Sequence, residues 1–141
     1  RTMKNLYNVK GDLEEDKFRI NKFGQFLRST SIDELPALIN IIKGEMSFVG
    51  PRPLLMKYLS IYNEQQIKRH DLKPGLTGLA QINGRNSITW KDKFEYDLKY
   101  NKHISFFLDL KIIFLTIIKV FLRKDINSKN IPTAIEFNGK N

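Results

Sequence analysis

The most hydrophobic stretch of this chain, residues 104–122, constrains its fold more than any other feature. It is long enough to cross a bilayer as a helix, but three charged residues interrupt it: Asp109, Lys111 and Lys119. A span would bury each charge at a cost of about 2.5–3.5 kcal/mol near the bilayer centre. On a helix, the polar residues fall mostly along one stripe in which Ile112 is the only apolar member: Ser105, Asp109, Thr116, Lys119 and Arg123. Such a helix lies in a membrane interface or packs against its own domain, and the pattern leaves both open.

Composition limits the size of the fold, the kinds of partner and the kinds of metal site that this chain can have. A chain of 141 residues, of which 41% are hydrophobic, has the size of one domain with a modest core. Its formal net charge of +9 indicates an anionic partner, which is nucleic acid, acidic lipid or a phosphorylated small molecule. The lack of cysteine excludes disulfides and thiolate metal sites. We recognise no signal peptide, and the opening Arg1-Thr2-Met3-Lys4 leads us to expect a fragment of a longer sequence.

The apolar periodicity predicts a mainly helical α+β domain. After a polar loop at 1–17, it indicates four helices before the apolar stretch, at 18–29, 31–44, 54–69 and 89–101. Lys73-Pro74-Gly75 predicts a turn, and Asn83-Gly84 is the typical signal of a tight β-hairpin. We therefore expect one domain over 1–126, with a small β-hairpin and amphipathic membrane-surface helices. A loose polar tail is expected at 127–141.

Two adjacent carboxylates, Asp33 and Glu34, stand near the start of the predicted helix at 31–44. Ser31 and Glu34 have the spacing of a capping box, so one interpretation is purely structural. Pro36 indicates that the helix is interrupted here, because proline lacks an amide proton and its ring crowds the carbonyl four residues back. The regular helix therefore begins near Pro36 or is kinked there. Either arrangement leaves unpaired backbone N–H groups beside the carboxylates, in a place that attracts phosphate.

Carboxylates that face a phosphate need cations to offset the repulsion. Arg28 lies five residues before Asp33, and Arg52 stands in the stiff run Gly50-Pro51-Arg52-Pro53. The guanidinium fork suits phosphate oxygens better than a lysine amine does. Mg²⁺ also suits such a place, since it binds through one or two carboxylates together with substrate phosphates. These groups are the ones that phosphoryl transfer through a carboxylate nucleophile requires.

Three ordered blocks resemble the bacterial sugar transferase family, whose members are monotopic polyprenyl-phosphate phosphoglycosyl transferases. The blocks are Thr30-Ser31-Ile32-Asp33-Glu34-Leu35-Pro36, then Gly44-Glu45-Met46-Ser47-Phe48-Val49-Gly50-Pro51-Arg52-Pro53, then Lys73-Pro74-Gly75-Leu76-Thr77-Gly78-Leu79-Ala80-Gln81-Ile82-Asn83-Gly84-Arg85-Asn86. The likeness runs from Arg1 to about Arg123. Three blocks in this order and spacing are specific, whereas a lone Asp-Glu or Asn-Gly pair is not.

The resemblance implies a reaction in two half-steps. Asp33 would attack the β-phosphate of a UDP-sugar, release UMP and hold the phosphosugar covalently. Polyprenyl (undecaprenyl) phosphate would then take the phosphosugar, giving polyprenyl-diphosphate-sugar as the first membrane step of glycan assembly. The family uses Mg²⁺, which Asp33 and Glu34 would bind. The resemblance also implies that the protein lies on the cytoplasmic face of the bacterial inner membrane.

The resemblance assigns further residues to the substrate. Arg28 and Arg52 stand where the family places phosphate-binding arginines, and Gln81, Asn83 and Arg85 fall in the block near the site. Asp97 matches an acidic position of the family, although a solvated helix face explains it equally well, and Asn83-Gly84 on its own indicates a turn. Only two histidines are present, His70 and His103, so a histidine metal site is not expected. Relatives begin with a hydrophobic membrane helix, and only Arg1-Thr2-Met3 of the basic segment after it stands here.

Two other functions fit parts of the sequence. A nucleic-acid-binding module would use the basic charge, but the lysines are scattered and no nucleic-acid motif is present. We therefore expect no nucleic-acid partner. A non-catalytic basic membrane-surface scaffold or binding module would explain residues 104–122 and the charge. It gives no purpose to the carboxylate pair or to the Pro-Arg-Pro run.

Overall fold

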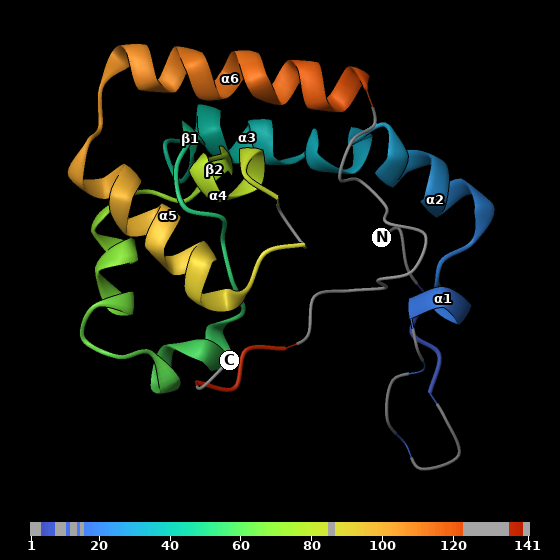
Figure 1. Cartoon of the computed structure of the whole chain (residues 1–141). Coiled ribbons are helices and arrows are strands. Elements are labelled where there is room, and N and C mark those ends of the chain that lie inside the picture. Colours follow the sequence, from blue (N-terminus) through green and yellow to red (C-terminus); the bar gives the residue numbers. More distant parts are fainter. Residues whose placement is uncertain are drawn as a thin grey trace.

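The computed structural model of the chain describes residues 4–7, 11, 14, 16–84, 87–122 and 136–139. At its centre lies a small two-stranded sheet, formed by β1 (Ser47–Val49) and β2 (Gly75–Thr77). Helix α4 (Leu79–Ile82) follows β2, and the long helix α6 (Phe106–Phe121) runs across one side of the sheet (Figure 1). Helix α5 (Trp90–Lys102) packs against α4. The predicted mainly helical α+β class is confirmed.

The sheet is parallel, so the predicted β-hairpin is wrong. Ser47 pairs with Gly75 and Val49 with Thr77, and the Ser47 amide also donates to the Pro74 carbonyl at 2.9 Å. Lys73-Pro74-Gly75, which we predicted to be a turn, therefore leads directly into β2. A parallel pair cannot close through a tight turn and needs a long crossover, which residues 50–74 supply.

The Asn83-Gly84 pair ends a helix instead of turning a hairpin. Asn83 follows the last residue of α4, and its side-chain amide donates to the Leu79 carbonyl at 2.7 Å. Gly84 has φ 140°, a backbone conformation that L side chains rarely adopt, and a Cβ there would lie only 2.6 Å from Ile88 Cγ2. Asn-Gly thus marks a tight change of chain direction here, but its tertiary context makes it the end of α4.

The crossover contains two 3₁₀ helices where one α-helix was predicted at 54–69. These are η2 (Met56–Ile61) and η3 (Gln66–Asp71), with an extended residue, Tyr62, after η2. Asn63 accounts for the break, because its side-chain oxygen accepts from the amides of Gln65 at 3.0 Å and Gln66 at 2.8 Å. It thereby starts a new helix instead of continuing the first one.

The N-terminal helices are confirmed in outline and corrected in detail. The helix predicted at 18–29 consists of α1 (Asp16–Arg19) and α2 (Lys22–Ser29), with Asn21 between them accepting from the Gly24 amide at 2.7 Å. The helix predicted at 31–44 is broken at Pro36, as that residue required. The 3₁₀ helix η1 (Ile32–Glu34) precedes Pro36 and α3 (Ala37–Ile42) follows it.

Helix α6 packs against the domain through its polar stripe. Ile112, the one apolar residue of that stripe, is fully buried beside Val49 and Tyr100. Thr116 and Thr77 of β2 share a hydrogen bond between their hydroxyls at 2.6 Å, and the Tyr100 hydroxyl donates to the Asp109 carboxylate at 2.7 Å. Burial and this hydrogen bond both raise the pKa of Tyr100, so the phenol stays protonated. Polar residues of the stripe therefore form hydrogen bonds with Thr77 and Tyr100 of the domain beneath α6.

The opposite, apolar face of α6 is exposed. Its large side chains lie open to solvent in the described structure: Phe106, Phe107, Leu110, Phe114, Ile117 and Phe121. Within the described residues, no helix is both long and apolar enough to cross a membrane. Of the arrangements that the sequence left open, the structure has the helix packed on its domain with its apolar face uncovered.

Two clusters of buried side chains form the core. One lies under α6 and contains Val49, Tyr100 and Ile112. The other is aromatic and joins η2 to α5 through Tyr58, Trp90, Phe94 and Phe137. Phe137 belongs to the region predicted as a loose tail, 127–141, most of which lies outside the described residues. In its described part, 136–139, Phe137 is only 4% exposed and Glu136 pairs with Lys57 at 2.6 Å.

Phe137 should therefore contribute to stability as a core residue. We expect Phe137→Ala to lower the free energy of unfolding by about 3–5 kcal/mol, because it empties the centre of the aromatic cluster. Chemical denaturation measures the loss. Phe107→Ala provides a matched control on the exposed face of α6 and should change stability by less than about 0.5 kcal/mol. Equal effects of the two substitutions would contradict the packing of Phe137.

Candidate functional site

A mainly apolar pocket of about 260 Å³ opens between η1, the sheet, α4 and α6. Its apolar wall comes from β1, β2 and one side of α6, including Phe48, Leu76, Ile113, Ile117 and Val120. Its polar groups come from five separate segments of the chain: Ser31, Glu34, Arg52, Thr77, Gln81, Thr116 and Lys119. A concave apolar site with a few convergent polar groups is the usual form of a ligand-binding site.

Glu34 and Arg52 form an ion pair at this pocket. Arg52 Nη1 donates to Glu34 Oε1 at 3.2 Å, and both side chains keep partial contact with solvent. The carboxylate and the arginine predicted for the site are 18 residues apart in sequence, and the fold brings them together. The pairing leaves the Arg52 guanidinium with further donors for an anionic ligand.

Backbone contacts fix the chain on either side of this arginine. The Gly75 amide donates to the Pro51 carbonyl at 2.9 Å, and the Gly50 amide donates to the Thr77 carbonyl at 2.9 Å. The backbones approach so closely that a Cβ on Gly75 would overlap the Gly50 amide nitrogen, and one on Gly50 would lie 2.6 Å from the Lys73 carbonyl. Glycine at both positions is therefore what allows β2 to lie against the segment that carries Arg52.

Asp33 lies in η1 next to Glu34 and is exposed. The predicted capping box is absent: Ser31 has a left-handed backbone with φ 55°, and its side chain makes no capping hydrogen bond. A positive φ is unusual for a serine and indicates local strain at the start of η1. The short helix η1 and the break at Pro36 hold the two carboxylates in adjacent positions near a helix start. Glu34 lines the pocket, whereas Asp33 lies next to it in η1 and outside the pocket lining.

The donor set suits Mg²⁺ only in one mode of binding. Within the described part of the chain, no group of three or more Asp, Glu, His or Cys side chains is placed to hold a metal ion. Asp33 and Glu34 offer carboxylate oxygens from adjacent residues of η1. Because Mg²⁺ commonly binds through one or two carboxylates and substrate phosphates, these residues fit an ion that arrives with its substrate.

The other predicted residues are placed as follows. Gln81 lines the pocket, and both atoms of its side-chain amide are buried without a hydrogen-bond partner among the described residues. An unpaired buried amide is costly, which marks Gln81 as a group available to a ligand. Asn83 is exposed at the end of α4 and lies outside the pocket lining. Arg85 lies outside the described residues, and Arg28 belongs to α2 with a side chain that is not described.

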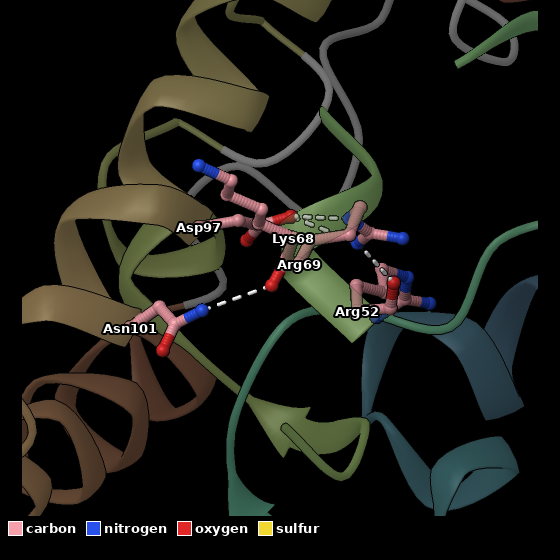
Figure 2. A network of polar contacts seen from close by, with 5 residues as sticks. All are labelled: Arg52, Lys68, Arg69, Asp97 and Asn101. Carbon is pink, nitrogen blue, oxygen red and sulfur yellow. Dashed lines mark hydrogen bonds and ion pairs between the residues drawn. The ribbon is translucent and has the colours of Figure 1, made fainter. Parts of the chain in front are cut away.

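Asp97 is buried in an ion pair away from the pocket. Its Oδ2 accepts from Arg69 Nε at 3.0 Å and from Arg69 Nη2 at 2.8 Å, as Figure 2 shows. The solvated helix face considered from the sequence is therefore wrong, since the side chains are only 3% and 5% exposed. Burial raises the pKa of the Asp97 carboxyl, and the Arg69 guanidinium opposes that rise.

Three basic residues near the site were not predicted. Lys119 lines the pocket from α6, and its position in the polar stripe was a usable signal. Lys93 lies over the Trp90 ring at 4.2 Å, and burial together with the positive charge of Arg52 lowers its pKa. No local sequence pattern indicated a role for Arg69, because its partner Asp97 stands 28 residues later in the chain. Lys119 and Lys93 thus add positive charge near the site beyond Arg28 and Arg52, whereas the charge of Arg69 is paired with Asp97.

The two ion pairs should differ sharply in their effect on stability. We expect Arg52→Gln to lower the free energy of unfolding by less than about 1 kcal/mol, because the pair with Glu34 is partly exposed. Asp97→Asn should lower it by about 3–5 kcal/mol, because it leaves the Arg69 charge buried without its partner. Urea denaturation compares the variants, and a small loss for Asp97→Asn would contradict the buried pair.

Comparison with known proteins gives a consistent result. A family model described as bacterial sugar transferase matches residues 1–123. The chain is 53% identical over 139 residues to the uncharacterized sugar transferase EpsL of Bacillus subtilis, covering 99% of this chain and 69% of that protein. It is 47% identical over 118 residues to a UDP-glucose:undecaprenyl-phosphate glucose-1-phosphate transferase of Klebsiella pneumoniae. An Escherichia coli protein of the same description is 42% identical over 134 residues.

Coverage differs among these relatives. The matches cover 78% and 88% of this chain, but only 25% of the Klebsiella protein and 29% of the Escherichia coli protein. The shared region contains Asp33, Glu34, Arg52 and Gln81 within the span of the family model.

Proposed function

The chain belongs to the bacterial sugar transferase family, and from this premise we propose that it transfers a sugar 1-phosphate from a UDP-sugar to undecaprenyl phosphate. The observation that carries the proposal is the Glu34–Arg52 pair beside Asp33, at the edge of an apolar pocket. A carboxylate nucleophile and an arginine suit a diphosphate, and an apolar wall suits a lipid acceptor. The product, a polyprenyl-diphosphate-sugar, would begin the assembly of a polysaccharide or other glycan.

The first half-reaction uses Asp33 as the nucleophile. One carboxylate oxygen attacks the β-phosphorus of the UDP-sugar, and an O–P bond forms as the bond from the β-phosphorus to the bridging oxygen breaks. UMP leaves with that bridging oxygen and its electron pair, while the phosphosugar stays on Asp33. Exposure of Asp33 on a short helix supports this role, because the carboxylate is open to a bulky donor.

The second half-reaction returns Asp33 to its free form. A phosphate oxygen of undecaprenyl phosphate attacks the same phosphorus, and the bond from Asp33 to phosphorus breaks. The product carries the diphosphate between lipid and sugar, and the carboxylate regains its electron pair. No external oxidant, reductant or water is consumed in either step.

Positive groups around the site would oppose the repulsion between carboxylate and phosphate. Arg52 is the described candidate for a phosphate clamp, with Arg28 as the second expected one. Lys93 and Lys119 add positive charge close to the same region. Bound Mg²⁺, held by Asp33 and Glu34, would supply charge neutralisation for the diphosphate.

The remaining residues would orient the substrate or the loops around it. The unpaired buried amide of Gln81 is suited to a polar group of the donor that enters the pocket. Asn83 and Arg85 are expected near the donor from the sequence block they share with Gln81. Asp97 is proposed to act through Arg69, because its burial separates it from a substrate in the pocket.

The uncovered face of α6 supports contact with a lipid surface. Its exposed phenylalanines and aliphatic residues form an apolar face, while Ile113, Ile117 and Val120 of the same helix line the pocket. A helix in the membrane interface with this face inward would bring a lipid acceptor to the pocket wall. The net charge of +9 would favour a surface containing anionic lipid. We propose the cytoplasmic face of the inner membrane, where the nucleotide-sugar donor would be met.

Mass spectrometry of the intact protein tests the nucleophile. After incubation with Mg²⁺ and a panel of UDP-sugars, without lipid acceptor, we expect a gain of one phosphosugar for the donor that is used. Asp33→Asn should show no gain, because an amide is a poor nucleophile. Adding undecaprenyl phosphate should remove the adduct from the unaltered protein and yield UMP and lipid product in equal amounts.

The outcome separates the enzyme from a scaffold. An adduct on the unaltered protein that persists in Asp33→Asn would assign the nucleophile to another residue. Turnover with no covalent adduct under any quench would contradict the two-step scheme. Lipid binding without any turnover, in a chain that extends to the full length of its relatives, would favour the non-catalytic membrane scaffold.

Liposome sedimentation tests the membrane surface. Phe114→Glu places a charge in the exposed apolar face of α6 and should reduce binding to vesicles of phosphatidylglycerol and phosphatidylethanolamine by about tenfold or more. Lys91→Gln, on the exposed surface of α5, changes the net charge by the same single unit and should reduce binding only slightly. Equal losses in the two variants would show that charge alone drives binding and would contradict insertion of α6.

A further inference from the structure

A buried arginine connects α5 to the segment that carries the site arginine. Arg69 lies in η3 and is enclosed with Asp97 of α5, with both side chains at most 5% exposed. The Arg69 guanidinium also lies over the Phe94 ring at 5.8 Å. Two hydrogen bonds to one carboxylate oxygen and an aromatic ring beside the guanidinium leave Arg69 with very little freedom to move.

The same guanidinium makes one contact outside this pair. Arg69 Nη2 donates to the backbone carbonyl of Arg52 at 2.6 Å, as well as to Asp97 at 2.8 Å (Figure 2). Arg52 stands between two prolines, so its own φ and ψ set the direction in which its side chain leaves this stiff segment. Fixing its carbonyl therefore fixes the base of the side chain that pairs with Glu34.

We propose that Arg69 and Asp97 are positioning residues, which hold the Arg52 backbone so that its guanidinium meets Glu34 and the donor's diphosphate. The inference rests on the proposed function for the role of Arg52, but the geometry on which it depends is independent of the substrate. The chain of contacts runs from Asp97 to Arg69 Nη2, then to the Arg52 carbonyl, and through the Arg52 side chain to Glu34. Asp97 thereby affects phosphate binding without touching the phosphate.

A second link between η3 and α5 provides a matched control. Asn101 Nδ2 donates to the Lys68 carbonyl at 2.9 Å, one turn along α5 from Asp97 and one residue before Arg69 (Figure 2). It joins the same two helices but, within the described structure, makes no hydrogen bond to Arg52. Asn101→Ala therefore loosens the junction of η3 with α5 without removing the donor to the Arg52 carbonyl.

Two variants disrupt the contact of this donor with the Arg52 carbonyl in different ways. Arg69→Lys keeps the positive charge beside Asp97 but loses the planar fork that serves Asp97 and Arg52 together. The double variant Arg69→Met with Asp97→Leu replaces the buried pair by apolar side chains, a change that proteins often tolerate without loss of stability. Thermal denaturation of each variant identifies any that fails to fold, and only folded variants enter the comparison.

The rate of adduct formation on Asp33 gives the kinetic test. We expect both variants to lower this rate by about 10- to 100-fold, the range that a small misplacement of a substrate-binding group causes, and Asn101→Ala to change it by less than about twofold. In an Arg52→Ala background, Arg69→Lys should cause no further loss, because its effect passes through Arg52. A full additional loss in that background, or an equal effect of Asn101→Ala, would overturn the inference.

Nuclear magnetic resonance of Arg52 decides the inference without turnover. Its backbone amide signal should shift and its side-chain Nε–H should become more mobile in Arg69→Lys and in the double variant, but not in Asn101→Ala. Unchanged Arg52 signals would overturn the inference even in an active enzyme. A protein that forms no adduct with any UDP-sugar, yet shows these changes at Arg52, would contradict the proposed function and leave the positioning contact established.

Discussion

The parallel pairing of β1 with β2 is the contact on which the rest of the site depends. It places residues 47–51 directly against residues 74–78, although the two segments are separated by the whole crossover. The approach is close enough that Gly50 and Gly75 admit no side chain. Because Arg52 follows β1 and Gln81 follows β2, pairing of the strands brings an arginine and a buried amide to one pocket. A side chain at either glycine would separate the strands and the site together.

Helix α6 reverses the arrangement usual for a helix on a water-soluble domain. A helix packed on a core normally turns its apolar side inward, whereas α6 turns its polar stripe inward and satisfies it with Tyr100 and Thr77. In water this leaves several phenylalanines exposed, with an unfavourable free energy that grows with their apolar area. Transfer of that face into a lipid interface removes the penalty. The same helix lines the pocket, so the surface that favours lipid and the site that would take a lipid acceptor are parts of one element.

Local patterns predicted most helices and the position of the carboxylate pair near a helix start, because the causes of both are local. Pro36 by itself breaks the helix after Glu34, so the sequence placed the carboxylate pair at a helix start correctly. The Asn83-Gly84 pair led to the wrong prediction of a β-hairpin, because a local turn signal does not say which elements the turn connects. Three other features depend on residues that are far apart in sequence: the pairing of β1 with β2, the burial of Phe137 and the Arg69–Asp97 ion pair. A single sequence carries no pattern that joins them.

The two ion pairs on Arg52 and Arg69 differ in their exposure. In the proposed reaction, the exposed pair would serve binding and the buried pair would serve support. Glu34 and Arg52 are partly open to water, where a single pair contributes about 0–1 kcal/mol. In the proposed reaction, a phosphate would therefore replace Glu34 at the guanidinium with little loss of free energy. Arg69 and Asp97 are enclosed, and separating them would leave charges buried without partners, at several kcal/mol. A guanidinium that exchanges one anion for another during a reaction has to be partly exposed to solvent, as Arg52 is. Its backbone has to be held by a rigid, buried contact, and the hydrogen bond from Arg69 to the Arg52 carbonyl links the buried pair to the exposed one.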